Sequence, residues 1–380
     1  MDIKLNADQV EIARQARRFC ENETPIEYAR KMFEDPKGYT DEIWGKMVEM
    51  GWTAMCIPED YDGLGLELMD LAVVVEEMGR IVAPGPFFSS TVLAGEVLKA
   101  AGDSGRKSSY LSRMAAGEIK GALAMCEAEG GGDPEYINLT ARPDGDGFIL
   151  NGCKAPVPDA HTADFLICAA RTAAGAEATA GITLFLVDLP NDGLKVTPLP
   201  AMDGTRKPCA VEFDNLRLGA DTILGNVNRG WDPLGKALQR AWVIMSAECV
   251  GGAQRAMEIA TAYAKERVQF DQPIACFQSI KHMCAQMYVE TESARSLLYW
   301  AAWAQDHADA KEAAVSASVS KSYCADAYRN AAAKAIQILG GTGMTWEHDI
   351  HLYIKRSKAN ELSLGDRNYH RERVVRLLTA

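Results

Sequence analysis

Apolar residues in the first third of the chain recur at the three- and four-residue spacing of a helix. One such set is Val10, Ala13, Ala16 and Phe19. Asn6, followed by Gln9 three residues later, has the pattern of a capping box at the start of this helix. Thr40 is a second candidate cap, and residues 69–79 form another apolar helical stretch. The pattern predicts an N-terminal α-helical domain over residues 1–117.

From about residue 119 the helical period gives way to short runs rich in β-branched and aromatic residues. The clearest runs cover residues 147–152, 165–168, 182–187 and 210–213. Clusters of Gly, Asp, Asn and Pro separate them, and the small-residue stretch 171–181 is predicted to be a surface loop. We therefore predict a middle β domain over residues 118–230.

Helical spacing returns after Trp231 and continues to the end of the chain. The predicted helices cover residues 232–266, 279–307, 311–339 and 349–364, and a short one follows. Long helices joined by short loops are typical of an antiparallel four-helix bundle. Residues 231–380 are thus predicted to form a C-terminal four-helix domain.

The bulk composition narrows the class of protein. The chain has 380 residues, 48% of them hydrophobic and 24% charged, as in globular proteins. A net charge of −12 argues against binding to nucleic acid or to an anionic membrane. No apolar run is long enough to span a bilayer, and the first residues lack the features of a secretory signal. Ten cysteines without C-x-x-C spacing predict a reduced, cytoplasmic chain without a metal site.

The stretch RVQFDQPIACFQSIK, residues 267–281, joins two of the predicted long helices. Pro273 predicts a turn at Gln272–Pro273. A cation, two rings and an amide at a helix–helix corner can hold a nucleotide, and Arg267, Phe270, Phe277 and Gln278 supply them. The residues alone leave an alternative open: the two rings are ordinary core, and the arginine pairs with a nearby carboxylate.

The same string resembles the R-x-Q-F-x-x-P-I-x-x-F-Q-x-I signature of the acyl-CoA dehydrogenase family. The run QILGGTG, residues 337–343, is similar to that family's Q-I-L-G-G-x-G. The resemblance implies an N-terminal α domain, a β-barrel-like middle domain and a four-helix C-terminal domain that forms tetramers. It also implies FAD as the cofactor, an acyl-CoA thioester as the substrate and an electron-transfer flavoprotein as the electron acceptor. The reaction it implies is α,β-dehydrogenation.

That reaction needs a carboxylate to remove the α-proton, and the sequence lacks one at both positions that the family uses. Leu364 stands before Gly365, where the E-G-T segment has Glu. The alternative position, early in the long helix before Arg267, falls on Ala241, with Trp242 where many members have Arg. Three other acids lie nearby in sequence: Asp366, Glu361 and Glu248. We expect each to be a solvated or ion-paired carboxylate.

The segments that resemble the family's flavin-facing strands are altered too. In the run Met125–Asp133, Cys126 replaces the usual Thr and Gly132 the usual Ser. In the K-x-W-I-T-N-G segment, Pro156 and Pro158 replace Trp and Thr, so an aromatic ring and a hydrogen-bond donor are lost. A flavin would then depend on backbone groups at four candidate positions: Met125, Cys126, Val157 and Pro158.

By contrast, the segments that hold a neighbouring subunit's FAD in the family are retained. They comprise Arg267, Gln269, Phe270, Phe277, Gln278, Gln337, Gly340 and Gly341. This favours a subunit that completes the FAD site of a homologous, base-bearing partner, as in bacterial α2β2 acyl-CoA dehydrogenases, which the chain also resembles. Two alternatives remain: a self-sufficient homotetrameric flavoenzyme with a relocated base or an atypical reaction, and a flavin-free scaffold that binds acyl-CoA.

Overall fold

The computed structural model describes residues 4–128, 130, 132–175 and 177–379, and it divides into two compact units. The first unit combines Met1–Lys31, Leu68–Ala83 and Trp242–Ala380. The second combines Met32–Glu67 and Pro84–Ala241. Each unit is therefore assembled from segments that are distant in the sequence.

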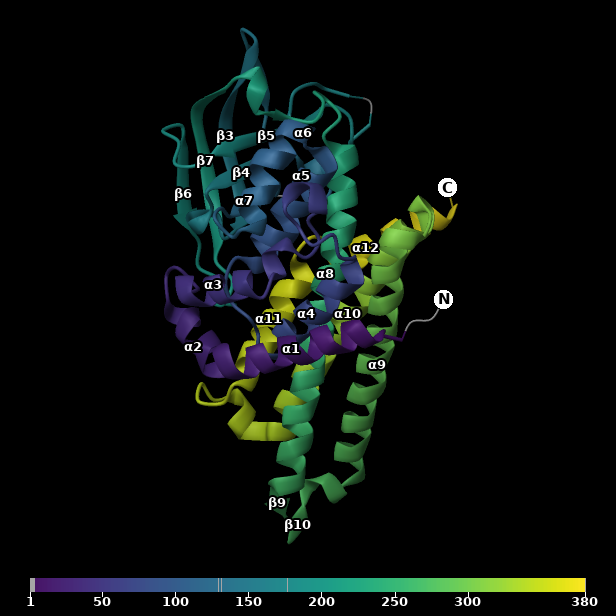
Figure 1. Ribbon diagram of the computed structural model, residues 1–380. Helices are drawn as coiled ribbons and strands as arrows, with labels where there is room; N and C mark the ends of the chain where they lie inside the picture. Colours follow the sequence, from purple (N-terminus) through teal and green to yellow (C-terminus); the bar gives the residue numbers. More distant parts are fainter. Residues whose placement is uncertain (1–3, 129, 131, 176, 380) are drawn as a thin grey trace. The chain divides into compact units, whose positions relative to one another are not determined.

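The first unit is helical (Figure 1). Its helices are α1 (Ala7–Glu23), the first part of α2 (Ile26–Glu34), α4 (Leu68–Arg80), most of α8 (Trp231–Glu266), α9 (Gln278–His307), α10 (Ala310–Leu339), α11 (Ile350–Leu362) and α12 (Arg367–Thr379). Helix α10 packs against α9, α11 and α12, while α4 packs against α1 and α9. The four long helices predicted after Trp231 are confirmed, with bounds that differ by at most two residues.

Two predicted helix starts have the expected caps. The Asn6 side chain accepts a hydrogen bond from the Gln9 backbone N–H at 2.8 Å, and the Gln9 side chain accepts one from the Asn6 N–H at 3.1 Å. Thr40 caps α3 (Asp41–Glu49) through the N–H of Ile43. Such caps satisfy backbone donors that a helix leaves unpaired, so local chemistry sets these boundaries.

The second unit contains two four-stranded sheets beside short helical segments. One sheet has the order β1-β4-β5-β8 and the other β2-β3-β7-β6. The strands are β1 (Gly121–Ala124), β2 (Ala141–Asp144), β3 (Gly147–Pro158), β4 (Phe165–Arg171), β5 (Ile182–Asp188), β6 (Leu194–Pro198), β7 (Pro208–Leu218) and β8 (Ile223–Leu224). Among the strand pairs described in these two sheets, β1 and β4 run parallel and the others antiparallel. Side chains from both sheets, such as Val157, Cys168 and Val211, share one buried core.

The helical segments of the second unit are short. They are α3, η1 (Trp52–Ala54), η2 (Glu59–Tyr61), η3 (Phe87–Ala94), α5 (Gly95–Ala101), α6 (Ser104–Arg106), η4 (Lys107–Leu111), α7 (Ser112–Ala115), η5 (Pro134–Tyr136), η6 (Ala160–Thr162) and η7 (Ala220–Thr222). Two of them, η3 and η4, are π-helical. The chain thus runs from helices through two β-sheets to helices, as predicted.

Candidate functional site

The hairpin of α8 and α9 ends in a tight β-turn. Strands β9 (Val268–Gln269) and β10 (Gln272–Pro273) pair antiparallel, and Phe270 and Asp271 between them have φ of 53° and 61°. Positive φ at both central residues is the geometry of a two-residue type I′ turn. The predicted turn at Gln272–Pro273 is therefore wrong: the turn lies two residues earlier, and Pro273 sits in the ladder.

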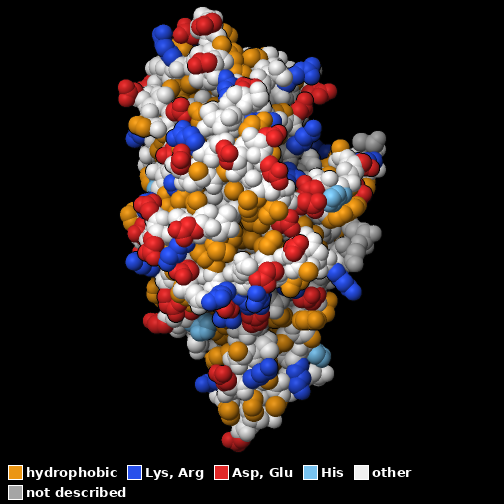
Figure 2. Space-filling view, viewed as in Figure 1, with side chains coloured by type: hydrophobic (Ala, Val, Ile, Leu, Met, Phe, Trp, Pro, Cys, Tyr) orange, Lys and Arg blue, Asp and Glu red, His pale blue; other side chains and the backbone are white. Residues whose placement is uncertain are grey.

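This tip presents aromatic and polar side chains to the outside of the unit. Phe270 is 86% exposed, and its ring packs edge-to-face on Phe277 with centroids 6.0 Å apart. Arg267, Gln269 and Gln278 are also exposed. Figure 2 shows hydrophobic and basic side chains side by side at the end where β9 and β10 lie in Figure 1. The tip thus brings together the cation, the two rings and the amides that the sequence singled out.

The alternative role for Arg267 is an ion pair within the chain. Its backbone is fixed by two hydrogen bonds, from its N–H to the Tyr263 carbonyl at 2.8 Å and from the Ile274 N–H to its carbonyl at 2.8 Å. Among the residues that the structure describes, no carboxylate forms an ion pair with its guanidinium. The charge is therefore free to meet an anion from outside the unit.

A second exposed segment begins where α10 ends, at η9 (Gly340–Met344). Gly340 has φ 62° and ψ −134°, a conformation open to glycine only. A Cβ added at Gly340 or Gly341 would meet no atom within 4 Å, and the side chain of Gln337 is exposed. This surface is bare backbone, which lets a ligand approach closely.

Arg30, which the sequence analysis did not single out, holds the loop that follows. Its Nη1 and Nη2 donate to the carbonyls of Trp346 and Glu347, each at 2.9 Å, and it pairs with Asp349. The partners are more than 300 residues away in sequence, so no local pattern marks this arginine.

The four predicted flavin-facing positions lie in the second unit, and the carbonyls of two of them, Met125 and Cys126, already accept hydrogen bonds. Lys154, wholly buried, donates from Nζ to the Met125 carbonyl at 2.9 Å and to Glu127 at 2.6 Å. The Ala155 N–H donates to the Cys126 carbonyl at 2.9 Å. Burial raises the pKa of the Cys126 thiol, so it stays neutral. The buried ion pair of Lys154 with Glu127 therefore holds the backbone around Met125 in place.

The other two positions offer little to a ligand. The side chain of Val157 is fully buried in the core between the sheets, and Pro158 has no N–H. Two residues of the altered run, Glu129 and Gly131, lie outside the described residues. A flavin isoalloxazine ring at this place would therefore be held by a few backbone groups.

The three acids near the expected base positions all have structural partners. Asp366 Oδ1 accepts the N–H groups of Asn368 and Tyr369, each at 2.9 Å, and so caps α12. Glu361 pairs with Arg329 at 2.6 Å and Lys358 at 2.8 Å. Burial opposes ionisation of Glu361, but these two cations hold its pKa below the usual range. An engaged, ionised carboxylate is a poor candidate for a mobile base.

The third acid, Glu248, forms a buried ion pair with Arg356. At the two positions that the family uses for a base, the structure has apolar side chains: Leu364, with φ 56°, and the fully buried Ala241. The ring of Trp242 packs edge-on against that of His370, with ring centroids 4.8 Å apart. Each of these two positions therefore lacks a group that can take a proton.

Lys321 on α10 fixes the loop that contains Leu364. Its buried ammonium donates to the carbonyls of Asn360 at 2.8 Å, Glu361 at 3.3 Å and Gly365 at 3.0 Å. Burial lowers the pKa of Lys321 to about 8. A lysine in an Ala- and Ser-rich helix gives no sequence signal of this role.

These observations bear on how each half of FAD would fit. The exposed tip and the bare Gly340–Gly341 backbone suit an adenosine and pyrophosphate, which need a cation, stacking rings and close backbone approach. The segments around Cys126 and Pro158 offer few donors to an isoalloxazine ring. The first unit therefore fits its half of the cofactor better than the second unit does.

Comparison with known proteins agrees with the motifs. Three family models match consecutive parts of the chain: the acyl-CoA dehydrogenase N-terminal domain over residues 6–118, the middle domain over 122–216 and the C-terminal domain over 228–379. No helix within the described part of the chain is long and apolar enough to cross a membrane.

Individual relatives cover nearly the whole chain. Acyl-CoA dehydrogenase IpdE2 of Mycolicibacterium smegmatis is 32% identical over 340 residues, 89% of this chain and 88% of the relative. The caffeyl-CoA reductase-Etf complex subunit CarC of Acetobacterium woodii is 32% identical over 344 residues, 89% of each chain. A glutaryl-coenzyme A dehydrogenase in complex with glutaryl-CoA matches with a TM-score of 0.90 at 26% identity, over 99% of this chain and 96% of that one.

The motifs, the order of helices and sheets, and these matches agree on one fold and one chemistry. The family comprises oxidoreductases that act on CH–CH groups, with acyl-CoA substrates and FAD as the typical cofactor. The chain belongs to the acyl-CoA dehydrogenase family.

Proposed function

We propose that this chain completes the FAD site of a homologous, base-bearing partner chain, with which it forms an acyl-CoA dehydrogenase. In the reaction, the partner's carboxylate takes the α-proton of the acyl-CoA. Bound FAD would supply the acceptor for a hydride equivalent from the β-carbon, which would leave a double bond between the two carbons. An electron-transfer flavoprotein then accepts the electrons, and the name of the relative CarC places that protein in an Etf complex.

The observation that carries this proposal is the contrast between the two sets of predicted site residues. Arg267 and Phe270 project from the hairpin tip, and Arg267 is free of ion pairs to the described residues. Inside the chain, Asp366, Glu361 and Glu248 are all engaged as a helix cap or in ion pairs. An outward-facing surface that suits a nucleotide, together with the engagement of these three described acids, supports a role in another chain's site.

We assign the cofactor-binding roles accordingly. Arg267 would pair with a pyrophosphate oxygen and Phe270 and Phe277 would stack near the adenine. Gln269, Gln278 and Gln337 would supply amide contacts, and the backbone of Gly340 and Gly341 would lie against the nucleotide. Met125, Cys126, Val157 and Pro158 are left as weak backbone contacts to a flavin of the chain's own. The proposed domain division stays at residues 1–117, 118–230 and 231–380.

The second candidate is a self-sufficient homotetramer with a relocated base or a reaction that needs none. It is favoured by the near-complete coverage of relatives named as dehydrogenases and reductases. A flavin-free scaffold that binds acyl-CoA is the third. Flavin absorbance separates the candidates. The chain purified alone would be yellow with one flavin per chain if it were self-sufficient, and largely colourless otherwise.

Co-expression with a homologous chain that carries Glu at the position of Leu364 or Ala241 provides the second arm. A tetramer with fewer flavins than chains, and with dehydrogenase activity toward an acyl-CoA, supports the paired subunit. If the chain binds no flavin either alone or after co-expression, and forms no complex, the remaining candidate is the flavin-free scaffold that binds acyl-CoA.

A further inference from the structure

The α8–α9 hairpin extends beyond the helices that cover its base (Figure 1). Along the hairpin, Tyr288 and Val289 on α9 are each 57% exposed. At 1.5 Å per residue, Arg267 lies roughly 13 Å beyond Glu258 along α8. The direction of this two-helix arm must therefore be set at its base.

At that base, the backbones of α4 and α8 cross in direct contact. A Cβ on Gly251 of α8 would lie 1.8 Å from the carbonyl oxygen of Glu76. A Cβ on Gly79 of α4 would lie 2.2 Å from the carbonyl oxygen of Glu248. Glycine at both positions is what lets the two helices meet this closely.

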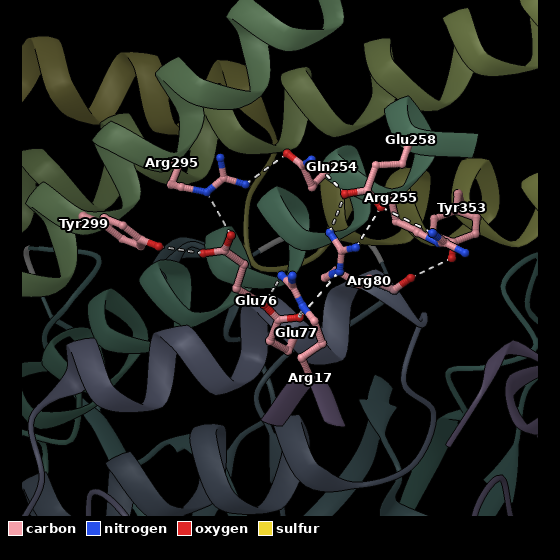
Figure 3. A network of polar contacts seen from close by, with 10 residues as sticks. All are labelled: Arg17, Glu76, Glu77, Arg80, Gln254, Arg255, Glu258, Arg295, Tyr299 and Tyr353. Carbon is pink, nitrogen blue, oxygen red and sulfur yellow. Dashed lines mark hydrogen bonds and ion pairs between the residues drawn. The ribbon is translucent and has the colours of Figure 1, made fainter. Parts of the chain in front are cut away.

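Polar contacts around the crossing tie α9 to both helices (Figure 3). Arg295 on α9 donates from Nε to Glu76 on α4 at 2.9 Å and from Nη2 to Gln254 on α8 at 3.2 Å. The Tyr299 hydroxyl also donates to Glu76, at 3.2 Å. Glu76 is thus held by two residues of the arm.

A second set of contacts continues the network along α4. Arg80 binds Glu258 of α8 with both terminal nitrogens, at 2.7 and 3.0 Å, and approaches Glu77 at 3.5 Å. Arg17 on α1 binds Glu77 bidentately, at 2.7 and 2.8 Å. Bidentate pairs fix orientation as well as distance, so α1, α4 and α8 are locked in register here.

The network borders two clefts. Cavities of about 390 and 350 Å³ lie beside it and share Arg17, Glu77 and Arg80 in their walls. The side chains of Glu76 and Glu77 are nonetheless only 11% and 7% exposed. Removing a partner from such a buried pair leaves an uncompensated charge. Polar contacts therefore add to the close backbone packing at this crossing.

We infer that six residues form a brace that positions the hairpin tip, and with it the nucleotide contacts of Arg267 and Phe270. The brace consists of Glu76, Glu77, Arg80, Gln254, Glu258 and Arg295. This inference rests on the proposed function, because it assumes that the tip binds FAD of a partner chain. These are positioning residues, since none of them reaches the tip.

The test is a double-mutant cycle on the co-purified complex, with FAD titrated into the flavin-free form and its binding followed by fluorescence. Arg295→Ala should weaken FAD binding about three- to thirtyfold, the range for coupling through packed networks. Arg267→Ala should also weaken it, and the loss in the double variant should be smaller than the sum of the two single losses. Once the Arg267 contact is gone, the brace can act only through the remaining contacts of the tip, such as that of Phe270. Arg14→Ala, which removes an exposed arginine paired with Glu11, is the matched control.

Additive effects of the two substitutions would overturn the brace, and so would an Arg295→Ala variant that melts earlier but binds FAD normally. If Arg267→Ala leaves FAD binding unchanged, the proposed function is contradicted, and so is the positioning role of the brace. Should Arg295→Ala not fold, Gln254→Ala removes one milder contact of the brace and is judged by the same criteria. Arg295→Lys keeps the charge and should recover part of the affinity.

Discussion

The imidazole of His370 on α12 lies edge-on against the indole of Trp242 on α8, with ring centroids 4.8 Å apart and planes at 88°. Both side chains are buried. Burial first, and then the charge of Lys321, lower the pKa of His370 to about 3. The ring is therefore neutral in the folded protein at ordinary pH.

This pair predicts an acid-sensitive component of stability. Unfolded histidine titrates near 6.5, so between about pH 6.5 and 3 the unfolded chain binds a proton that the folded chain does not. The contribution of His370 is complete above pH 6.5 and decreases by about 1.4 kcal/mol per pH unit below it. His370→Gln should shrink the difference in unfolding free energy between pH 7 and pH 5 by about 2 kcal/mol. Denaturant titrations at the two pH values measure it.

The matched control is His282→Gln, which changes an exposed histidine on α9 and should leave the difference unchanged. An equally large pH effect in His370→Gln and in the unmodified protein would contradict the assignment.

Asp366 and Glu361 are predicted not to be the catalytic base. Asp366→Asn keeps an oxygen for the cap of α12, and Glu361→Gln keeps a neutral partner for Arg329. Turnover of the complex should stay within about tenfold in each, whereas loss of a general base costs about 10²–10⁴. Steady-state rates at saturating acyl-CoA, with flavin content measured in parallel, decide this. A collapse of turnover in Asp366→Asn with flavin still bound would mean that Asp366 is the base.

Arg267→Ala should lower flavin occupancy of the complex without destabilising the chain. The exposed guanidinium supplies one charge-assisted contact, worth about 1.5–3 kcal/mol, or roughly a ten- to hundredfold weaker FAD affinity. Arg376→Ala, at an arginine of α12 that is 77% exposed, controls for the lost charge. Equal flavin occupancy in the two variants would argue against a role of the tip in cofactor binding.

Substitutions at the adjacent Gly340 and Gly341 distinguish the effect of backbone strain from the effect of a blocked ligand contact. Gly340→Ala places a Cβ at φ 62° and ψ −134°, so melting temperature should fall together with flavin content. A methyl group added at Gly341 would stand in open space, and this residue has no positive φ. Gly341→Ala should therefore weaken FAD binding while the melting temperature stays within about 1–2 °C of the parent, because the methyl meets only the ligand. Unchanged FAD binding in Gly341→Ala would place the nucleotide elsewhere.

Much of the fold could be predicted because its signals are local. The cap at Asn6, the cap at Thr40 and the long apolar periods after Trp231 depend on neighbouring residues only. Strand β2 was missed because Ala141–Asp144 contains Pro and Asp, which disfavour strands. Its pairing with β3 decides its conformation.

The site was predictable only in part, because some of its contacts join residues that are far apart in the sequence. The sequence places Arg267 and Phe270 at a helix corner, but not their exposure or the type I′ turn between β9 and β10. The contact of Glu76 with Arg295 joins residues 219 positions apart. Contacts at such separation leave no periodic pattern in a single sequence.

We propose that this chain completes a partner's FAD site. The most direct measurement is the ratio of flavin to protein, by absorbance, on a complex of known mass, together with its dehydrogenase activity toward an acyl-CoA. We expect little flavin and no turnover for the chain alone, and an active tetramer with fewer flavins than chains when the partner is present. One flavin per chain in an active homotetramer would contradict it.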